Sequence, residues 1–196
     1  METTVQKENY KNIFYPPGGI LIWMIITLEV LTFAIALFAF AIQRIDNLEM
    51  FNSSRQQLNI LIGTINTIVL LSSGFFMAES LHKLKKGENK KSQFRMIAAI
   101  ALGTVFLVLK AIEFNTKIEQ GIGLEHNLFF TFYWLLTGFH FIHVFIGLII
   151  LIYLFIKIKN GYYNKENYFD VETGGAFWHM CDLIWMMLFP VLYLLH

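Results

Sequence analysis

Apolar residues fill five long runs along this chain, and short polar stretches separate the runs. Each run is close to or above the roughly 20 residues that a helix needs to cross the hydrocarbon core of a bilayer. The pattern therefore predicts an all-α, polytopic membrane protein, a bundle of five transmembrane helices. The predicted spans are residues 18–43, 58–82, 94–114, 127–156 and 176–195.

A mostly polar tail, residues 1–17, precedes the first span. The tail lacks the basic, apolar and small-residue segments of a cleaved signal peptide, so we expect the first span to serve as the insertion signal. The Pro-Pro-Gly-Gly sequence at 16–19 indicates a turn that leads into this helix. The connections between spans are too short for a second domain, so residues 18–196 are predicted to form one five-helix transmembrane domain.

The amino-acid composition also indicates a membrane protein rather than a soluble one. Hydrophobic residues make up 56% of the chain, above the roughly 45–50% that is usual for a soluble domain. The net charge of +1 gives no indication of a nucleic-acid partner. The single cysteine, Cys181, lies in an apolar run, which excludes a disulfide framework.

Lysine and arginine are distributed unequally between the two sides that the five spans define. The N-terminal tail and the loops at 83–95 and 157–175 hold 11 of them, whereas the loops at 44–57 and 115–126 and the C-terminus hold 3. The positive-inside rule then predicts that the N-terminus is cytoplasmic and the C-terminus lies outside. Aromatic side chains near span ends, Tyr193 among them, suit anchoring at the membrane interface.

The first span carries a carboxyl group, Glu29, about eleven residues after its start. At about 1.5 Å per residue, Glu29 lies roughly 16 Å deep, near the middle of the bilayer. A charge there costs on the order of 2.5–3.5 kcal/mol on insertion scales. We therefore expect Glu29 to be partnered or protonated. Its role is either packing between helices, or proton handling and the docking of a partner subunit.

Four pairs of polar residues at i, i+3 spacing lie in the other spans. His140 and His143 lie in the middle of the fourth span, on one side of the helix, and we expect them to face protein rather than lipid. Lys110 and Glu113, near the outer end of the third span, are expected to form a structural ion pair. The two remaining pairs are Glu79 with His82 and His179 with Asp182.

These side chains raise the question of a metal site. Glu79 and His82 have the Glu-x-x-His spacing of di-iron helix bundles. However, counted from the cytoplasmic ends, the fifth-span pair lies roughly 5–9 Å deep and His140 and His143 roughly 20–24 Å deep. Ligands bind metals at about 2 Å, so one ion cannot join them, and no second axial histidine at matching depth is evident for a haem. No metal or haem is predicted in this chain.

Four segments together resemble the cytochrome c oxidase subunit III family, subunit III of the haem-copper oxidases. Residues 137–147 resemble its Gly-Phe-His-x-x-His-Val signature, and residues 178–185 its Trp-His-x-x-Asp-x-x-Trp signature. Residues 28–30, with the aromatic-rich apolar run that follows them, resemble the helix that carries the family's intramembrane carboxyl, and residues 111–114 its Ala-x-Glu-Tyr/Phe segment. The segments follow the family's order and cover nearly the whole chain.

This chain has fewer spans than the longer members of the family. Those members have seven spans, with a lipid-filled cleft between the first two and the other five, and this chain begins at what resembles the third. It is similar to the five-helix form found in some bacterial oxidases and as a subunit-III-like protein that accompanies nitric oxide reductases.

The resemblance implies a non-catalytic subunit of the bacterial inner membrane that binds no haem or copper itself. Such a subunit packs against catalytic subunit I, with subunit II in the same complex, and supports stability and proton uptake. Glu29 corresponds to the carboxyl that reacts with hydrophobic carbodiimides, and bound phospholipid is expected. Subunit or lipid contacts are implied for His82, Glu79, His140, His143, His179 and Asp182.

Two other functions remain open from the sequence. One is an accessory protein of a nitric oxide reductase with the same fold. The other is a free-standing membrane metalloenzyme that would use His140, His143, Glu79 and His82. A transporter is disfavoured because the chain shows no inverted repeat and no pair of broken helices.

Overall fold

The computed structural model describes residues 16–195, and within that range its regular elements are all helical. The predicted tail at 1–17 therefore lies outside the described residues except for its last two positions. The elements are α2 (Ile20–Asp46), α3 (Leu48–Arg55), α4 (Ile60–Lys85), α5 (Asn89–Glu119), α6 (Leu128–Lys159), α7 (Phe169–Phe189) and a short π-helix, η1 (Pro190–Leu194).

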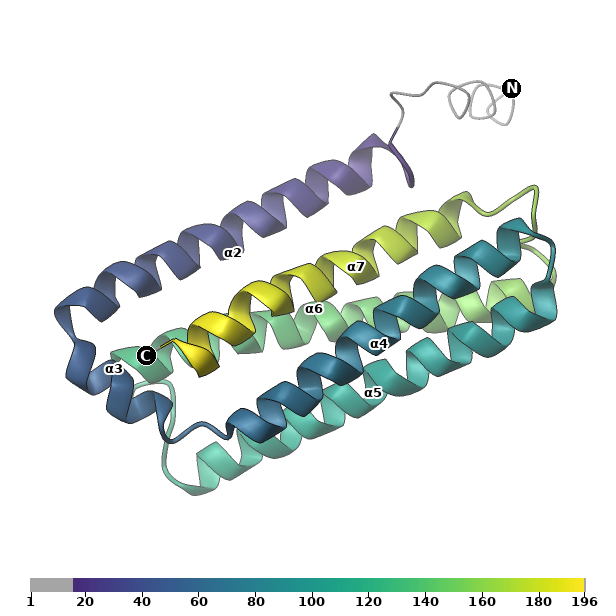
Figure 1. Cartoon of the computed structure of the whole chain (residues 1–196). Coiled ribbons are helices and arrows are strands. Elements are labelled where there is room, and N and C mark those ends of the chain that lie inside the picture. The colour runs from purple at the N-terminus through teal and green to yellow at the C-terminus, as the bar shows by residue number, and fades with distance from the viewer. Residues whose placement is uncertain (1–15, 196) are drawn as a thin grey trace.

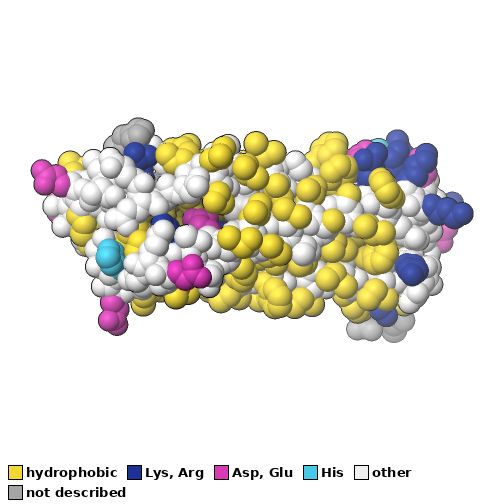
Figure 2. Space-filling view, turned by 90° about the horizontal axis from the view of Figure 1, so that it is seen from below, with side chains coloured by type: hydrophobic (Ala, Val, Ile, Leu, Met, Phe, Trp, Pro, Cys, Tyr) yellow, Lys and Arg dark blue, Asp and Glu magenta, His cyan; other side chains and the backbone are white. Residues whose placement is uncertain are grey.

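Five of these helices are long and apolar enough to cross a membrane, counting α7 together with η1. The shortest has 26 residues, or about 39 Å of helix against the roughly 30 Å of a hydrocarbon core. Large apolar side chains such as Leu21, Phe38 and Leu61 are 72%, 69% and 68% exposed, as suits a surface that faces lipid. Figure 2 shows this apolar surface around the middle of the molecule. The predicted all-α bundle of five membrane helices is confirmed.

Helices α4, α5, α6 and α7 form the body of the bundle, in which α4 and α6 each contact both α5 and α7. Helix α2 lies at the edge, along α7 and α6 (Figure 1). Only 17% of the apolar window of α2 is buried, against 33–50% for the other spans. Helix α2 is therefore the span whose sides are most open to lipid or to another subunit.

Glycines and serines allow the helices of the bundle to approach closely, as is common in membrane proteins. Gly103 of α5 and Gly147 of α6 lie on either side of the Trp178 indole, and a Cβ atom at either glycine would be 2.8 Å from the ring. Ser73 and Ser80 of α4 donate hydrogen bonds to backbone carbonyls of α5, at 2.7 and 2.9 Å. The Trp178 indole, packed against the two glycines, is fully buried.

The sequence pattern did not reveal the elements that close the end of the bundle opposite the lysine-rich loops. Helix α3 has eight residues, too few for a span, and its buried Arg55 donates a 3.1 Å hydrogen bond to the Tyr193 carbonyl in η1. Lys117 of α5 donates to the Gln57 carbonyl just after α3, at 2.6 Å. Pro190 opens η1, where the Leu195 amide bonds back to the Pro190 carbonyl. This segment therefore links α5 and the end of α7.

Helix ends differ from the predicted span ends where polar residues continue a helix beyond the apolar run. Helix α5 begins at Asn89 rather than at 94, and α7 begins at Phe169 rather than at 176. Hydropathy marks where a helix can meet lipid, whereas backbone hydrogen bonding continues until a cap or turn stops it.

The two glycines beside Trp178 yield a stability prediction. Gly103→Ala and Gly147→Ala should each lower the free energy of unfolding by about 1–3 kcal/mol, because the added methyl group overpacks the contact with the indole. Gly138→Ala is the matched control, since its Cβ would meet nothing within 4 Å. Thermal unfolding in detergent measures all three, and equal stabilities for the three variants would contradict the prediction.

Candidate functional site

The intramembrane carboxyl of α2 meets one histidine of α6. Glu29 Oε2 lies 3.3 Å from His143 Nε2, and the two side chains are 22% and 10% exposed. The other ring nitrogen, Nδ1, lies 2.9 Å from the Phe139 carbonyl oxygen one turn earlier in α6. The pair therefore connects two helices and is held in place from the α6 side.

The hydrogen-bond partners of His143 indicate where the pair carries its protons. A carbonyl oxygen only accepts hydrogen bonds, so Nδ1 of His143 carries a proton. The contact between Nε2 and Glu29 then needs one further proton, which sits either on the carboxyl or on the imidazole. In both cases the pair has no net charge, which is the arrangement that a low-dielectric environment favours.

His140 occupies a different environment from His143. Its ring is fully buried, stacks on Trp185 with centroids 5.3 Å apart, and meets the edge of Phe106 at 5.9 Å. Neither ring nitrogen has a hydrogen-bond partner among residues 16–195. Both histidine rings meet the Phe33 ring of α2, with centroids 6.4 and 5.9 Å apart, but only His143 reaches Glu29, whereas His140 also packs against α5 and α7.

The residues considered for a metalloenzyme do not converge. His143 pairs with Glu29, Glu79 forms a 3.0 Å ion pair with Arg95, and His140 stacks on an indole. His82 is exposed at the end of α4. Within the described part of the chain, no group of three or more His, Cys, Asp or Glu side chains is arranged to hold a metal ion.

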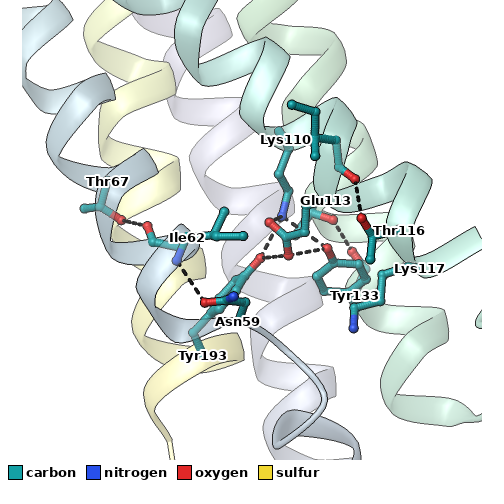
Figure 3. A network of polar contacts seen from close by, with 12 residues as sticks. Asn59, Ile62, Thr67, Lys110, Glu113, Thr116, Lys117, Tyr133 and Tyr193 are labelled. Atoms are coloured by element: carbon teal, nitrogen blue, oxygen red, sulfur yellow. Dashed lines mark hydrogen bonds and ion pairs between the residues drawn. The ribbon is translucent and has the colours of Figure 1, made fainter. Parts of the chain in front are cut away.

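Lys110 and Glu113 form the centre of a larger buried network toward the end of the bundle that carries α3 and η1 (Figure 3). The Lys110 Nζ lies 3.2 Å from Glu113 Oε2 and donates to the hydroxyls of Tyr193 and Tyr133, at 2.7 and 3.3 Å. Both hydroxyls donate to Glu113 Oε1, at 2.6 and 2.7 Å. Lys110 is 1% exposed and Glu113 4%, so two opposite charges and two phenols bond to one another in a buried site.

The two tyrosines are functional candidates that the sequence interpretation missed. The prediction that Tyr193 anchors the chain at the membrane interface is wrong, because its side chain is fully buried in the network. The burial of Tyr133 could have been predicted from its spacing, because it shares a helical face with Thr137, His140 and Val144, which are all buried. Nothing in the sequence indicated that η1 would bring Tyr193 to the same carboxylate.

An apolar cleft of about 460 Å³ lies between α2, α4 and α7, toward the lysine-rich end of the molecule. Four polar side chains border it: His82, Lys85, Glu172 and His179. Lys85 forms a 2.5 Å ion pair with Glu172. The rest of the lining is largely apolar and includes Trp23, Ile26, Met77, Leu81, Met180 and Leu183.

His179 and Asp182 form the expected contact within α7. His179 Nδ1 lies 3.2 Å from Asp182 Oδ2, and the two side chains are 46% and 9% exposed. The Asp182 carboxylate fits against Gly74 of α4, where a Cβ atom would lie 1.9 Å from Oδ2. Asp182 is thus part of the contact between α4 and α7, while His179 borders the cleft.

Ion pairs and hydrogen bonds also organise the loops at the lysine-rich end. Lys91, 2.7 Å from Glu88, lowers the pKa of that carboxyl through its hydrogen bond. The stabilisation that Glu88 contributes is therefore present above the ordinary pKa of a glutamate and is lost as the pH falls through the lowered value. Burial and a 2.7 Å hydrogen bond to Asp170 raise the pKa of Tyr163.

Comparison with known proteins identifies the family of this chain. A family model described as cytochrome c oxidase subunit III matches residues 18–196. The chain belongs to the cytochrome c oxidase subunit III family. Proteins named cytochrome c oxidase subunit 3 from Synechocystis, Thermostichus vulcanus and Schizophyllum commune are 31%, 32% and 34% identical to it over 140, 140 and 128 residues.

The coverage of these relatives is partial. The alignments span 71%, 71% and 65% of this chain and 59%, 68% and 47% of the three relatives, in the same order. The chain therefore matches about half to two thirds of the length of these subunit III proteins.

The buried network yields a test by charge removal. Lys110→Met leaves the Glu113 charge buried with only phenols as donors, so we expect a loss of about 3–5 kcal/mol in the free energy of unfolding. The double variant Lys110→Met, Glu113→Gln removes both charges and keeps an acceptor for the phenols, so it should recover much of that loss. Unfolding of both in detergent provides the comparison, and a double variant no more stable than Lys110→Met would contradict the interpretation.

Proposed function

We propose that this chain is the non-catalytic subunit III of a bacterial terminal haem-copper oxidase that reduces oxygen in aerobic respiration. The observation that carries the proposal is the family match over residues 18–196. The chain packs against catalytic subunit I, with subunit II in the same complex. The haem and copper centres belong to those partners, and this subunit supports the stability and the proton uptake of subunit I.

The charge distribution supports an orientation for the subunit. The lysine-rich ends of α4 and α6 and the start of α5 lie on the cytoplasmic side, and the end that carries α3 and η1 lies outside. Lys and Arg side chains gather at one end of the molecule in Figure 2. The protein then spans the bacterial cytoplasmic membrane with the cleft open toward its inner leaflet.

The pair of Glu29 and His143 supports a proton-linked role within the membrane. The proton shared between Nε2 and the carboxyl can sit on either group without changing the net charge of the pair. Its 22% exposed carboxyl is accessible to a small apolar reagent or to a partner helix. We assign to Glu29 the carbodiimide-reactive position of the family.

The cleft supports phospholipid binding. Its apolar walls suit acyl chains, and His82, Lys85 and His179 border it with groups that can donate to a phosphate. The cleft lies between α2 and the α4–α7 bundle, so it does not require the two helices that longer family members have in addition.

The subunit assignment is tested by co-purification. A tagged copy of the chain, expressed in its native host, should retain a catalytic subunit with haem absorbance, and the complex should consume oxygen. A partner that reduces nitric oxide instead would select the alternative complex. Stoichiometric haem on the isolated chain would overturn the non-catalytic role.

Carbodiimide labelling tests the position of Glu29. Glu29→Gln should abolish labelling by a hydrophobic carbodiimide, since the amide cannot form the adduct, and peptide mass spectrometry reads out the site. Glu79→Gln is the control, because Glu79 is paired with Arg95 at the inner end. Full labelling of the Glu29→Gln chain would remove the assignment.

Native mass spectrometry tests the lipid site. The double variant His82→Ala, Lys85→Ala should retain less phospholipid after detergent exchange than the wild-type chain, because two phosphate donors are lost. Lys159→Ala, an exposed lysine at the end of α6 outside the cleft lining, should retain the wild-type amount. Equal retention in all three proteins would place the lipid elsewhere.

A further inference from the structure

Four oxidisable side chains form a continuous path near the outer end of the bundle. The rings of Trp134 and Tyr133 have centroids 5.8 Å apart, and those of Tyr193 and Trp185 are 6.4 Å apart. One carboxylate oxygen, Glu113 Oε1, joins the two halves because it accepts both phenolic hydrogen bonds. The path starts at half-buried Trp134 and ends at buried Trp185.

The phenols are placed for oxidation with loss of a proton. A phenol that loses an electron becomes a strong acid, so its oxidation is easiest where a base can take the proton at the same time. Each hydroxyl lies 2.6–2.7 Å from Glu113 Oε1, within the 2.6–3.2 Å reach required of a general base. The carboxylate of Glu113 can therefore act as the base for either phenol.

The surroundings also suit a radical that persists. Tyr133 and Tyr193 are fully buried and Trp185 is 1% exposed, which limits contact with water-borne reductants. Lys110 donates a 2.7 Å hydrogen bond to the Tyr193 oxygen. This bond, and the proton on Glu113, would fix the phenoxyl oxygen in place after oxidation.

We infer that Trp134, Tyr133, Tyr193 and Glu113 form a radical sink that takes up one oxidising equivalent from the outer leaflet. A one-electron oxidant such as a lipid peroxyl radical takes an electron from Trp134 and, with a proton from water, becomes a hydroperoxide. Tyr133 or Tyr193 then returns an electron to the Trp134 cation radical and passes its phenolic proton to Glu113. The products are an intact Trp134, a neutral phenoxyl radical and a protonated Glu113.

This function goes beyond the role of a non-catalytic subunit, since it uses side chains of this chain and no bound cofactor. A second carboxylate-bonded phenol provides an internal comparison: Tyr163 donates to Asp170 at 2.7 Å, but its ring contact is with Tyr162 and not with a tryptophan. Tyr163 also lies at the opposite, lysine-rich end of the molecule. Tyr163 therefore has the same phenol–carboxylate hydrogen bond but no neighbouring tryptophan that could pass an electron.

The experiment uses the purified complex in lipid nanodiscs with a photogenerated ruthenium(III) oxidant in the outer solution. Flash absorption should detect a phenoxyl radical in the wild-type protein. In Glu113→Gln its rate of formation should fall about a hundredfold, as expected when a positioned base is lost. Mass spectrometry after steady illumination should find more oxidised Trp134 in this variant, because the tryptophan radical is no longer quenched.

Tyr163→Phe is the control and should change neither readout. Unchanged radical formation in Glu113→Gln, or an equal loss in Tyr163→Phe, would overturn the inference. The wild-type protein offers an independent measurement in case the variant does not assemble. Its light-induced infrared difference spectrum should gain a protonated-carboxyl band that shifts with ¹³C-labelled glutamate, and absence of that band would equally refute the radical sink.

Discussion

The dominant physical constraint on this molecule is that lipid offers no hydrogen bonds. Many polar side chains within the spans therefore bond to other protein groups, some to a carbonyl of their own helix and others to a neighbouring helix, and the second kind fixes one helix against another. Glu29 with His143 joins α2 to α6, and the network around Glu113 joins α5 and α6 to η1. Polar groups that would be costly alone thus determine the arrangement of an otherwise uniformly apolar bundle.

Close packing provides the second part of the arrangement. Apolar side chains gain little from leaving lipid for a helix interface, so shape decides which faces meet. Gly103 and Gly147 create the space that the Trp178 indole fills, and Gly74 makes room for the Asp182 carboxylate. The small residues are as specific as the polar ones, because a single added methyl group would displace an aromatic ring or a carboxylate.

The two ends of the bundle consequently have different chemical character. The lysine-rich end has loops joined by ion pairs and an apolar cleft bordered by two histidines. The other end is closed by α3 and η1 over a buried network of one carboxylate, one ammonium group and two phenols. This division fits the two roles that we propose, support of proton uptake at the lysine-rich end and a radical sink at the other.

The sequence by itself determined the fold class, the number of spans and the family, because hydropathy and spacing are properties of one helix at a time. It also indicated that Lys110 and Glu113 face each other, since they are one turn apart. Only the tertiary structure decided that His143 rather than His140 meets Glu29, and that Tyr193 lies in the core instead of at the interface. Those contacts depend on how each helix is rotated about its axis and on the turn made at Pro190. Neither can be predicted from a run of residues that is hydrophobic on all sides of the helix.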